Sequence, residues 1–469
     1  MSAHRPPSSA NVSPKTPRPS SPGRASAALC RLLDATVAAL QSIRAGQSGT
    51  AALDAVEASL RPGVQALLFQ ALRNLGRAQA LRRQLAPRNP PPRVDALLCT
   101  ALALAWDPQT APYEPFTLVN QAVEAAKRNP ATRAQASFIN ACLRRFLRER
   151  QALVAATDSD DMAVWNHPAW WIRRLRQDHP QHWQQILQAN NAHAPMVLRV
   201  SKSKSTPALY QQALDAINIE STLVGEWGVA LHRAVPVQQL PGFAEGVVSV
   251  QDAAAQMAAP LLLQGLDARQ PLRLLDACAA PGGKTAHLLE WADALHAPWQ
   301  VTALEVDAAR AARIHDNLHR LGLSAQVLVA DAGAPQDWWR QHCGGELFDA
   351  ILLDAPCTAS GIVRRHPDVR WLRRETDVAQ LAALQARLLA ALWPLLRPGG
   401  RLLYCTCSVF RAEGDAQVQA FLAHNTDAQL LASPGHLIPG KPDKSGALRD
   451  NGPGEHDGFF YALLHKSTA

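Results

Sequence analysis

The feature that most constrains the fold is an alternation of short β-type runs with helical stretches beyond Gly246. The β-type runs span residues 272–278, 301–306, 326–330, 348–354 and 401–405. Such alternation is typical of a parallel, doubly wound sheet, because each crossover helix returns the chain to the same edge. We therefore predict an α/β domain over residues 246–469. A last apolar run, Phe459–Leu464, follows a long loop and predicts a final antiparallel strand.

The preceding part of the chain divides into three regions, as expected when 469 residues exceed one compact core. Residues 1–27 are rich in Pro, Ser and Arg without an acidic residue, which predicts a disordered basic tail. Residues 28–151 carry apolar side chains at three- and four-residue spacing and predict an all-helical domain. Residues 152–245 combine a Trp-rich connector with a strand-like run at 197–200. This region is predicted to be a small α/β connector.

Charge gives a weaker indication of the partner. Lysine plus arginine number 47 against 39 acidic residues, and the pI near 9.3 suits a polyanion such as nucleic acid. The basic run 144–150 fits phosphate contacts or a solvated helix face, and for that run alone we favour the solvated face slightly.

The eight cysteines lack the dense spacing of a disulfide framework and predict reduced, cytoplasmic thiols. Cys405 and Cys407 have no second close pair to complete a tetrahedral metal site, so no metal is expected. No secretory signal is recognised, and we expect no apolar run near the ~20 residues of a membrane span. These observations predict a soluble, cytoplasmic protein, and we expect a monomer.

The segment Leu274–Thr285 follows a predicted strand and precedes a helix. Ligands of open α/β sheets bind at the carboxyl ends of strands, and glycines let the backbone approach a ligand closely. The spacing is neither G-x-G-x-x-G nor G-x-x-x-x-G-K-[ST], which disfavours a dinucleotide or a triphosphate. The loop is therefore predicted to hold another nucleotide-like cofactor.

Two acids are candidates for contacts with such a cofactor. Glu305, at the end of the second strand, suits two ribose hydroxyls and is preferred to Asp307, which falls just beyond the strand. Asp331, after the third strand, suits an adenine amino group, although a turn or helix cap is the usual role of a lone aspartate.

Two thiols follow neighbouring strands. Cys357 ends the run Asp354-Ala355-Pro356-Cys357, and Cys407 ends Tyr404-Cys405-Thr406-Cys407. Both are predicted to converge above one sheet edge beside the cofactor. Cysteines are often small buried hydrophobes, and this remains the expectation for Cys405.

These motifs resemble the RNA cytosine-5 methyltransferases of the Nop2/Sun/Fmu type. The resemblance rests on the cofactor loop 276–284, the proline-cysteine motif 353–357 and the threonine-cysteine motif 406–408. Residues 137–146 resemble the last helix of a NusB-like RNA-binding domain. Residues 250–252 and 364–368 look like the bacterial subgroup that modifies 16S ribosomal RNA.

The resemblance implies a Rossmann-like, seven-stranded methyltransferase domain preceded by an all-α NusB-like domain and a small α/β connector. It implies S-adenosyl-L-methionine as cofactor, Cys407 as nucleophile and Cys357 as the thiol that assists product release. Asp354 would hold either the methionine amine or the base edge, and Lys284 would lower a thiol pKa or only belong to the loop. The expected cofactor-binding residues are Cys278, Ala279, Ala280, Pro281, Gly282, Gly283, Lys284, Glu305, Asp331 and Asp354.

The chemistry agrees with this implication. Carbon-5 of cytosine is too poor a nucleophile to attack a sulfonium methyl, whereas thiolate addition at carbon-6 creates an enamine that can. The expected substrate is 16S ribosomal RNA, free or partly assembled, with transfer RNA as the alternative. A nicotinamide oxidoreductase and a non-catalytic RNA-binding or antitermination factor are the rival classes.

The chain departs from the family pattern in four respects. These are Glu305 in place of the usual aspartate, an insertion at 291–299, the extra Cys405, and the tail.

Overall fold

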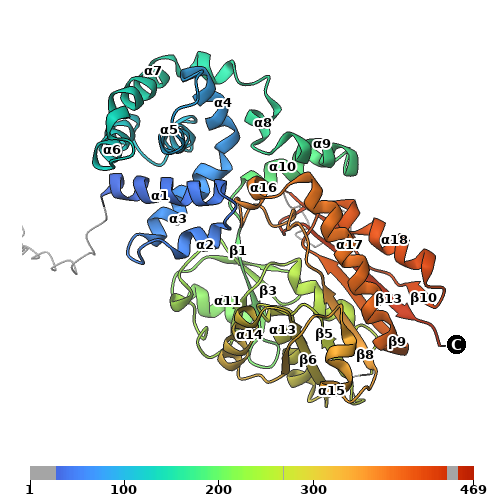
Figure 1. Cartoon of the computed structure of the whole chain (residues 1–469). Helices are drawn as coiled ribbons and strands as arrows, with labels where there is room; N and C mark the ends of the chain where they lie inside the picture. The colour runs from blue at the N-terminus through green and yellow to red at the C-terminus, as the bar shows by residue number, and fades with distance from the viewer. Residues whose placement is uncertain (1–27, 268, 441–452, 469) are drawn as a thin grey trace, which may run out of the picture.

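The structure is a computed structural model and describes residues 28–267, 269–440 and 453–468. It contains an all-helical region, a small antiparallel sheet and a large mixed sheet (Figure 1). The predicted tail, 1–27, lies outside the described residues.

The N-terminal region is all-helical, as predicted. Its helices are α1 (Leu29–Arg44), α2 (Gly49–Asp54), α3 (Arg61–Arg73), α4 (Leu75–Leu85), α5 (Pro92–Ala105), α6 (Pro115–Arg128) and α7 (Ala136–Ala155). They bury one continuous apolar cluster, to which α7 contributes Ile139 and Phe146. Phe138 differs from the expected pattern, because it lies on the outer face with 39% of its surface exposed.

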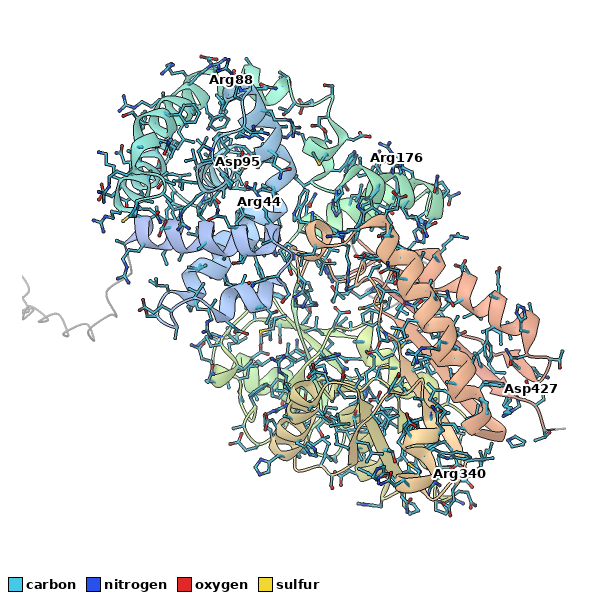
Figure 2. The ribbon with its side chains drawn as sticks, in the orientation of Figure 1. Arg44, Arg88, Asp95, Arg176, Arg340 and Asp427 are labelled. Atoms are coloured by element: carbon cyan, nitrogen blue, oxygen red, sulfur yellow. The ribbon has the colours of Figure 1, made fainter. Side chains whose placement is uncertain are left out.

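Polar contacts also tie these helices together. Arg44, at the end of α1, donates to Asp95 of α5 at 2.8 Å, and both residues lie inside the helical region (Figure 2). The predicted basic run lies on α7, where Arg144, Arg145 and Arg148 are exposed. Arg145 is paired with Glu149 one turn later at 2.9 Å.

The connector contains helices and a separate small sheet. The helices are α8 (Asp161–Trp165), α9 (Ala169–Asp178), α10 (Trp183–Asn191) and α11 (Pro207–Asp215), and the strands are β1 (Met196–Val200), β2 (Ser221–Val224), β3 (Gly228–Leu231) and β4 (Val248–Val250). The strands are antiparallel in the order β2-β3-β1-β4. The expected boundary at 245/246 therefore separates β4 from its own sheet; a three-residue strand gives too short a pattern to be assigned from sequence.

The large sheet carries the predicted parallel strands. Its strands are β5 (Arg273–Asp276), β6 (Gln300–Glu305), β7 (Gln326–Val329), β8 (Phe348–Asp354), β9 (Leu396–Thr406), β10 (Ala428–Leu430), β11 (Gly435–Pro439), β12 (Pro453–Gly454) and β13 (Phe459–Lys466). Strands β7-β6-β5-β8-β9 are parallel, and β13 pairs antiparallel with β9, as predicted. Seven strands form the run from β7 to β11. Two short strands, β10 and β12, add to the edge beside β13 and β11, so the sheet has nine strands rather than seven within the described part of the chain.

Helices cover both faces of this sheet. They are α12 (Ala258–Leu263), α13 (Gly283–Leu295), α14 (Ala308–Leu321), α15 (Trp339–Cys343), α17 (Glu375–Leu392) and α18 (Asp415–His424). The short helix α16 (Val369–Leu372) packs instead against the N-terminal helical region. Helices α12, α13 and α14 belong to one apolar cluster, and α17 and α18 belong to the cluster on the other face. Figure 1 shows α17 and α18 side by side along the sheet.

One helical stretch corrects the expectation about apolar runs. Residues Glu375–Leu395 are long and apolar enough to cross a membrane by length and composition, and a window of 18 residues within them has a mean hydropathy of 1.3. In the fold, this helix buries Leu388, Leu389 and Leu392 against the sheet. Its Gln385 side chain is fully buried and donates to the carbonyl of Pro356 at 2.9 Å. These contacts are those of a core helix in a globular domain.

A buried ion cluster joins the large sheet to the small one. Asp457 accepts from Arg364 Nε at 2.6 Å and also pairs with Arg365, while Asp252 accepts from Arg365 at 2.8 Å. Asp252, Arg364 and Asp457 are each less than 10% exposed. Charges removed from water must be paired to be tolerated, so each member of the cluster depends on the others.

The segment that follows the cluster contacts the helical region. Arg73 donates to the carbonyl of Arg364 at 2.9 Å, and the indole of Trp371 donates to the carbonyl of Leu72 at 2.9 Å. Asp368 accepts from the backbone N–H of Gly49 at 2.7 Å. Residues 364–371 therefore hold all three regions together.

We predict that Asp457→Ala lowers the free energy of unfolding by about 3 kcal/mol, because the buried Arg364 loses its close carboxylate partner and Arg365 keeps only Asp252. The matched control is Glu455→Ala, since Glu455 is an exposed partner of Arg364 at 3.1 Å and its loss should cost about 1 kcal/mol or less. Urea unfolding measures both values. Equal losses in the two variants would contradict a structural role for the buried cluster.

Candidate active site

The candidate site lies at the carboxyl edge of the parallel strands. Strands β5, β6, β8 and β9 run in the same direction, so the segments that follow them meet at one edge. This register brings the loop 277–284, Glu305, Asp354 and the two cysteine motifs together.

The loop 277–284 connects β5 to α13 through a turn that needs glycine. Gly282 has φ of +93°, a left-handed conformation that side chains rarely adopt, and α13 begins at Gly283. Cys278 is partly buried and Pro281 is exposed. Burial, followed by the nearby carboxylate of Asp276, raises the pKa of the Cys278 thiol, so this cysteine is a neutral part of the loop.

Glu305 faces this loop, and Asp307 does not. Glu305 is 3% exposed at the end of β6 and accepts from the backbone N–H of Ala280 at 3.3 Å. Arg310 also pairs with Glu305 at 3.1 Å. Asp307 caps α14 by accepting from the backbone N–H of Arg310 at 2.9 Å. The geometry favours Glu305 over Asp307 as the acid beside the loop.

Asp331 has the turn-capping contact, one of the two alternatives that the sequence left open. One oxygen accepts from the backbone N–H of Gly333 at 2.8 Å, which is the turn-capping contact. The other pairs with Arg387 of α17 at 3.1 Å, and 40% of the side chain is exposed. Asp331 therefore caps its own turn while its carboxylate stays accessible.

Lys284 and Asp354 form an ion pair across the site. Lys284 Nζ lies 2.6 Å from Asp354 Oδ2, and Cys405 Sγ lies 3.5 Å from the other oxygen of Asp354. Burial alone would lower the pKa of Lys284. The carboxylate of Asp354 and the sulfurs of Cys405 and Cys407 outweigh burial and raise that pKa. Lys284 thus stays a cation beside the cysteines, whereas burial raises the pKa of Cys405 and leaves it a neutral core thiol.

The two strand-end thiols meet, which confirms the predicted convergence. Cys357 Sγ lies 3.4 Å from Cys407 Sγ, and both residues are partly exposed. The hydrogen bond to Cys407, together with burial and the charge of Glu413, raises the pKa of the Cys357 thiol. Lys284 provides a positive charge near Cys407.

The sequence analysis gave no role of their own to two buried acids beside the site, Asp276 at the start of the loop 276–284 and Glu413. Asp276 is fully buried beneath the loop and accepts from Thr285 Oγ1 at 2.7 Å. Glu413, fully buried at the end of the 3₁₀ turn Arg411–Glu413, accepts hydrogen bonds from residues of both cysteine motifs. The sequence offered one indication of Glu413, which is an acidic residue five positions after the threonine-cysteine motif.

The arrangement provides two adjacent thiols, a cation and a set of acids around one loop. Among residues 28–267, 269–440 and 453–468, no group of three or more His, Cys, Asp or Glu residues is placed to hold a metal ion. This chemistry suits covalent catalysis by a thiolate on a substrate placed next to a cofactor.

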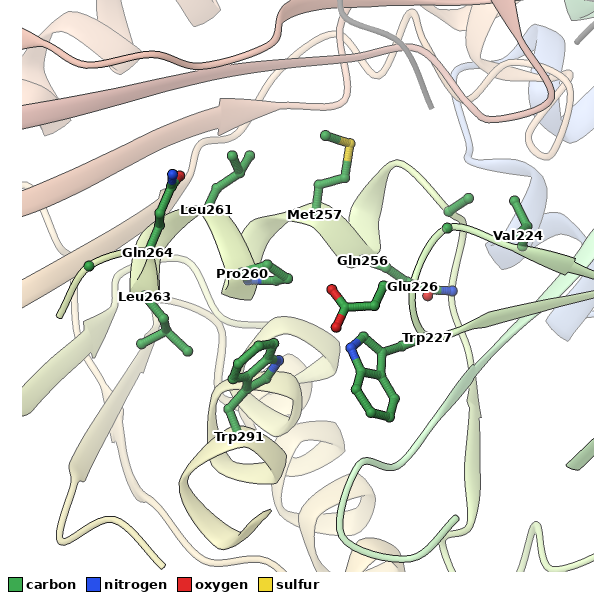
Figure 3. A pocket seen from close by; sticks show the side chains of 13 residues that line it. Val224, Glu226, Trp227, Gln256, Met257, Pro260, Leu261, Leu263, Gln264 and Trp291 are labelled. Carbon is green, nitrogen blue, oxygen red and sulfur yellow. The ribbon is translucent and has the colours of Figure 1, made fainter. Parts of the chain in front are cut away.

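A separate pocket lies away from these residues. It has a volume of about 540 Å³ between the β2–β3 turn and helices α12 and α13. Figure 3 shows Trp227 and Trp291 facing this pocket, with Met257 on the opposite wall. No residue expected in the catalytic or cofactor site lines it.

Three protein families match successive parts of the chain. Residues 263–465 match the family described as 16S rRNA methyltransferase RsmB/F. Residues 167–238 match the ferredoxin-like domain of the RsmF/B-like methyltransferases, and residues 30–148 match the NusB family.

Individual proteins are similar over most of the chain. Ribosomal RNA small subunit methyltransferase B of Vibrio cholerae is 41% identical over 440 residues, which cover 92% of this chain and 96% of that protein. The protein of the same name from Klebsiella pneumoniae is 44% identical over 331 residues, 70% of this chain and 72% of its own length. A solved structure described as the crystal structure of PH0851 covers 92% of this chain and 99% of its own, with a TM-score of 0.69 and 25% identity.

We predict that Asp276 makes stability depend on pH. Burial raises the pKa of Asp276 from 3.8 to about 7, so the folded chain holds a proton that the unfolded chain releases near pH 4. The resulting stabilisation is complete below pH 4 and is lost as pH rises through 7. Asp276→Asn keeps an acceptor for Thr285 and removes this titration.

Urea unfolding between pH 5 and 8 tests this prediction. The free energy of unfolding of the wild type should fall relative to that of Asp276→Asn as pH rises. Asp316→Asn, at an exposed position of α14, is the control with the same charge change. A difference between wild type and Asp276→Asn that stays constant over this range would show that Asp276 does not titrate as described.

Proposed function

Because the chain belongs to the 16S rRNA methyltransferase RsmB/F family, we propose that it transfers a methyl group from S-adenosyl-L-methionine to carbon-5 of a cytosine in 16S ribosomal RNA. The observation that carries the cytosine assignment is the distance of 3.4 Å between the Cys357 and Cys407 sulfurs beside the cofactor loop. Methyl transfer to an oxygen or an exocyclic nitrogen needs no pair of thiols, whereas carbon-5 needs covalent activation.

The residues of the loop fit the proposed cofactor. A Cβ added at Gly283 would meet only the Gln251 side-chain amide, at 3.7 Å, so the backbone leaves room for a ligand there. Glu305 is an acid suited to ribose hydroxyls, and Asp331 and Asp354 are acids suited to the amino groups of adenine and methionine. When bound, S-adenosyl-L-methionine supplies an electrophilic methyl group.

Cys407 is proposed to be the nucleophile. Its thiolate adds to carbon-6 of cytosine, which makes carbon-5 an enamine carbon able to accept the methyl group. The ammonium of Lys284 places a positive charge near Cys407. Asp354, paired with Lys284 at 2.6 Å, lies between the loop and the thiols and is able to hold either the methionine amine or the base edge.

Cys357 is proposed to assist product release. After carbon-5 is methylated, its proton passes to solvent water, and the bond from Cys407 to carbon-6 breaks with its electron pair on the Cys407 sulfur, so that aromaticity is restored. Cys357 keeps its own proton, because its pKa is raised, and lies within 3.4 Å of the sulfur that must leave. A neutral thiol at this position is suited to protonate or orient the departing Cys407.

The rest of the chain is proposed to hold the RNA. The helical region, 28–151, and the connector, 152–245, place exposed arginines of α7 and α9 on the surface, where they are available to phosphates. A cytosine must leave its stack to reach thiols at a sheet edge, which favours free or partly assembled RNA over the mature subunit. We propose a monomer that acts in the cytoplasm.

We predict that Glu305→Ala weakens S-adenosyl-L-methionine binding by about ten- to a hundredfold, because a buried carboxylate loses hydrogen bonds to the ligand. Isothermal titration measures the change. Asp307→Asn is the control, since asparagine still caps α14 and the rival carboxylate is removed. Unchanged binding in Glu305→Ala, or comparable affinity of the wild type for NAD, would overturn the cofactor assignment.

We predict that the two thiol variants behave in opposite ways. Cys407→Ala should abolish turnover and form no covalent RNA adduct, whereas Cys357→Ala should trap the enzyme on methylated RNA. A denaturing gel shows the adduct, and mass spectrometry of the nucleosides identifies 5-methylcytidine. An adduct that accumulates in Cys407→Ala instead would reverse the two roles while leaving the reaction intact.

A further inference from the structure

Glu413 is a buried acid that connects the two cysteine motifs. One carboxylate oxygen accepts from the backbone N–H of Thr358, next to Cys357, at 2.8 Å. The other accepts from Ser408 Oγ, next to Cys407, at 2.6 Å and also from the hydroxyl of Thr358. A single side chain therefore holds the residues that follow both thiols.

Further bonds fix Glu413 itself. The amide of Gln385, from the core helix α17, donates to Glu413 at 3.3 Å and to the carbonyl of Pro356 at 2.9 Å. The backbone carbonyl of Glu413 accepts from the hydroxyls of Tyr404, at 2.9 Å, and Thr406, at 3.2 Å. Glu413 is thus attached to strand β9 on one side and to the proline-cysteine turn on the other.

The hydrogen bonds also indicate that the carboxyl group of Glu413 is ionised. Both carboxylate oxygens are approached by donors, two of which are N–H groups that cannot accept in return. Burial raises the pKa of Glu413, and the hydrogen bonds from Ser408 and Thr358 oppose that increase. Its negative charge is one of the factors that raise the pKa of Cys357.

We propose that Glu413 is a positioning residue for methyl transfer, which fixes the segments after Cys357 and Cys407 relative to each other and places a negative charge beside Cys357. This inference rests on the proposed function, because it assigns different roles to the two thiols. A cation near Cys407 and an anion near Cys357 polarise the pair in opposite senses. Both the charges and the geometry then disfavour an exchange of the proposed roles of Cys407 and Cys357.

The first test compares the full-length Glu413→Ala and Glu413→Gln variants on unmodified 16S ribosomal RNA with tritiated S-adenosyl-L-methionine. Glu413→Ala should lower kcat about 100-fold, because the thiols lose their fixed separation, with both KM values within about threefold of the wild type. Glu413→Gln keeps a side chain that can form hydrogen bonds, so its kcat should lie between those of Glu413→Ala and the wild type. Asp415→Asn, two residues away and paired with His436 rather than with the cysteine motifs, is the control and should keep the wild-type kcat.

The second test does not depend on RNA. In a Cys407→Ala background, alkylation of Cys357 by iodoacetamide is followed against pH by peptide mass spectrometry, with and without Glu413→Gln. Removing the negative charge should lower the pKa of Cys357. The alkylation rate at pH 8 should then rise about tenfold for each unit of that decrease. Cys405, which is also buried, is the internal reference for any general loosening of the fold.

The outcomes separate this inference from the proposed function. If the wild type forms no 5-methylcytidine, the proposed function fails. If the wild type forms 5-methylcytidine but both Glu413 variants keep the wild-type kcat, the positioning role is overturned. Unchanged alkylation of Cys357, or an equal rise at Cys405, overturns the electrostatic role even if Glu413→Ala fails to fold.

Discussion

The common direction of strands β5, β6, β8 and β9 is the constraint on which the candidate site depends. Each strand contributes one functional segment after its last residue, and parallel pairing places these segments at one edge. Asp354 of β8 is paired with Cys405 of β9, so the segments that lead to Cys357 and Cys407 leave the sheet at the same level along the strands. Two thiols 50 residues apart in the chain thereby come within 3.4 Å.

Buried charge then gives these segments different properties. Lys284, in the loop 277–284, is held by Asp354, and Glu413 is held by hydroxyls and amides beside Cys357. Neither charge would be tolerated in the core without its partners. The hydrogen bonds that satisfy the Glu413 carboxylate also hold Thr358 and Ser408, the residues next to the two thiols. The same contacts therefore determine both the position of the thiols and the charge beside them.

Much of this arrangement could be predicted from sequence, because it follows from local patterns. Apolar runs ending in an acid or a thiol predicted β6 and β8 and the meeting of Cys357 with Cys407. Contacts between distant segments could not be predicted in this way. Strand β4 is only three residues long, and its membership of the small sheet depends on pairing with β1. Glu413 has no motif of its own, since its role depends on Thr358, which lies 55 residues earlier in the chain.

The segment 364–371 also has a bearing on how proteins of this architecture can diversify. It begins seven residues after Cys357, and it contacts the helical region through Arg73, Leu72 and Gly49. The helical region is therefore not a detachable module joined by a free linker. A recombination event that exchanged it for another RNA-binding unit would also have to supply new partners for Asp368 and Trp371. Such an architecture is expected to evolve by gradual change at this seam rather than by shuffling of whole domains.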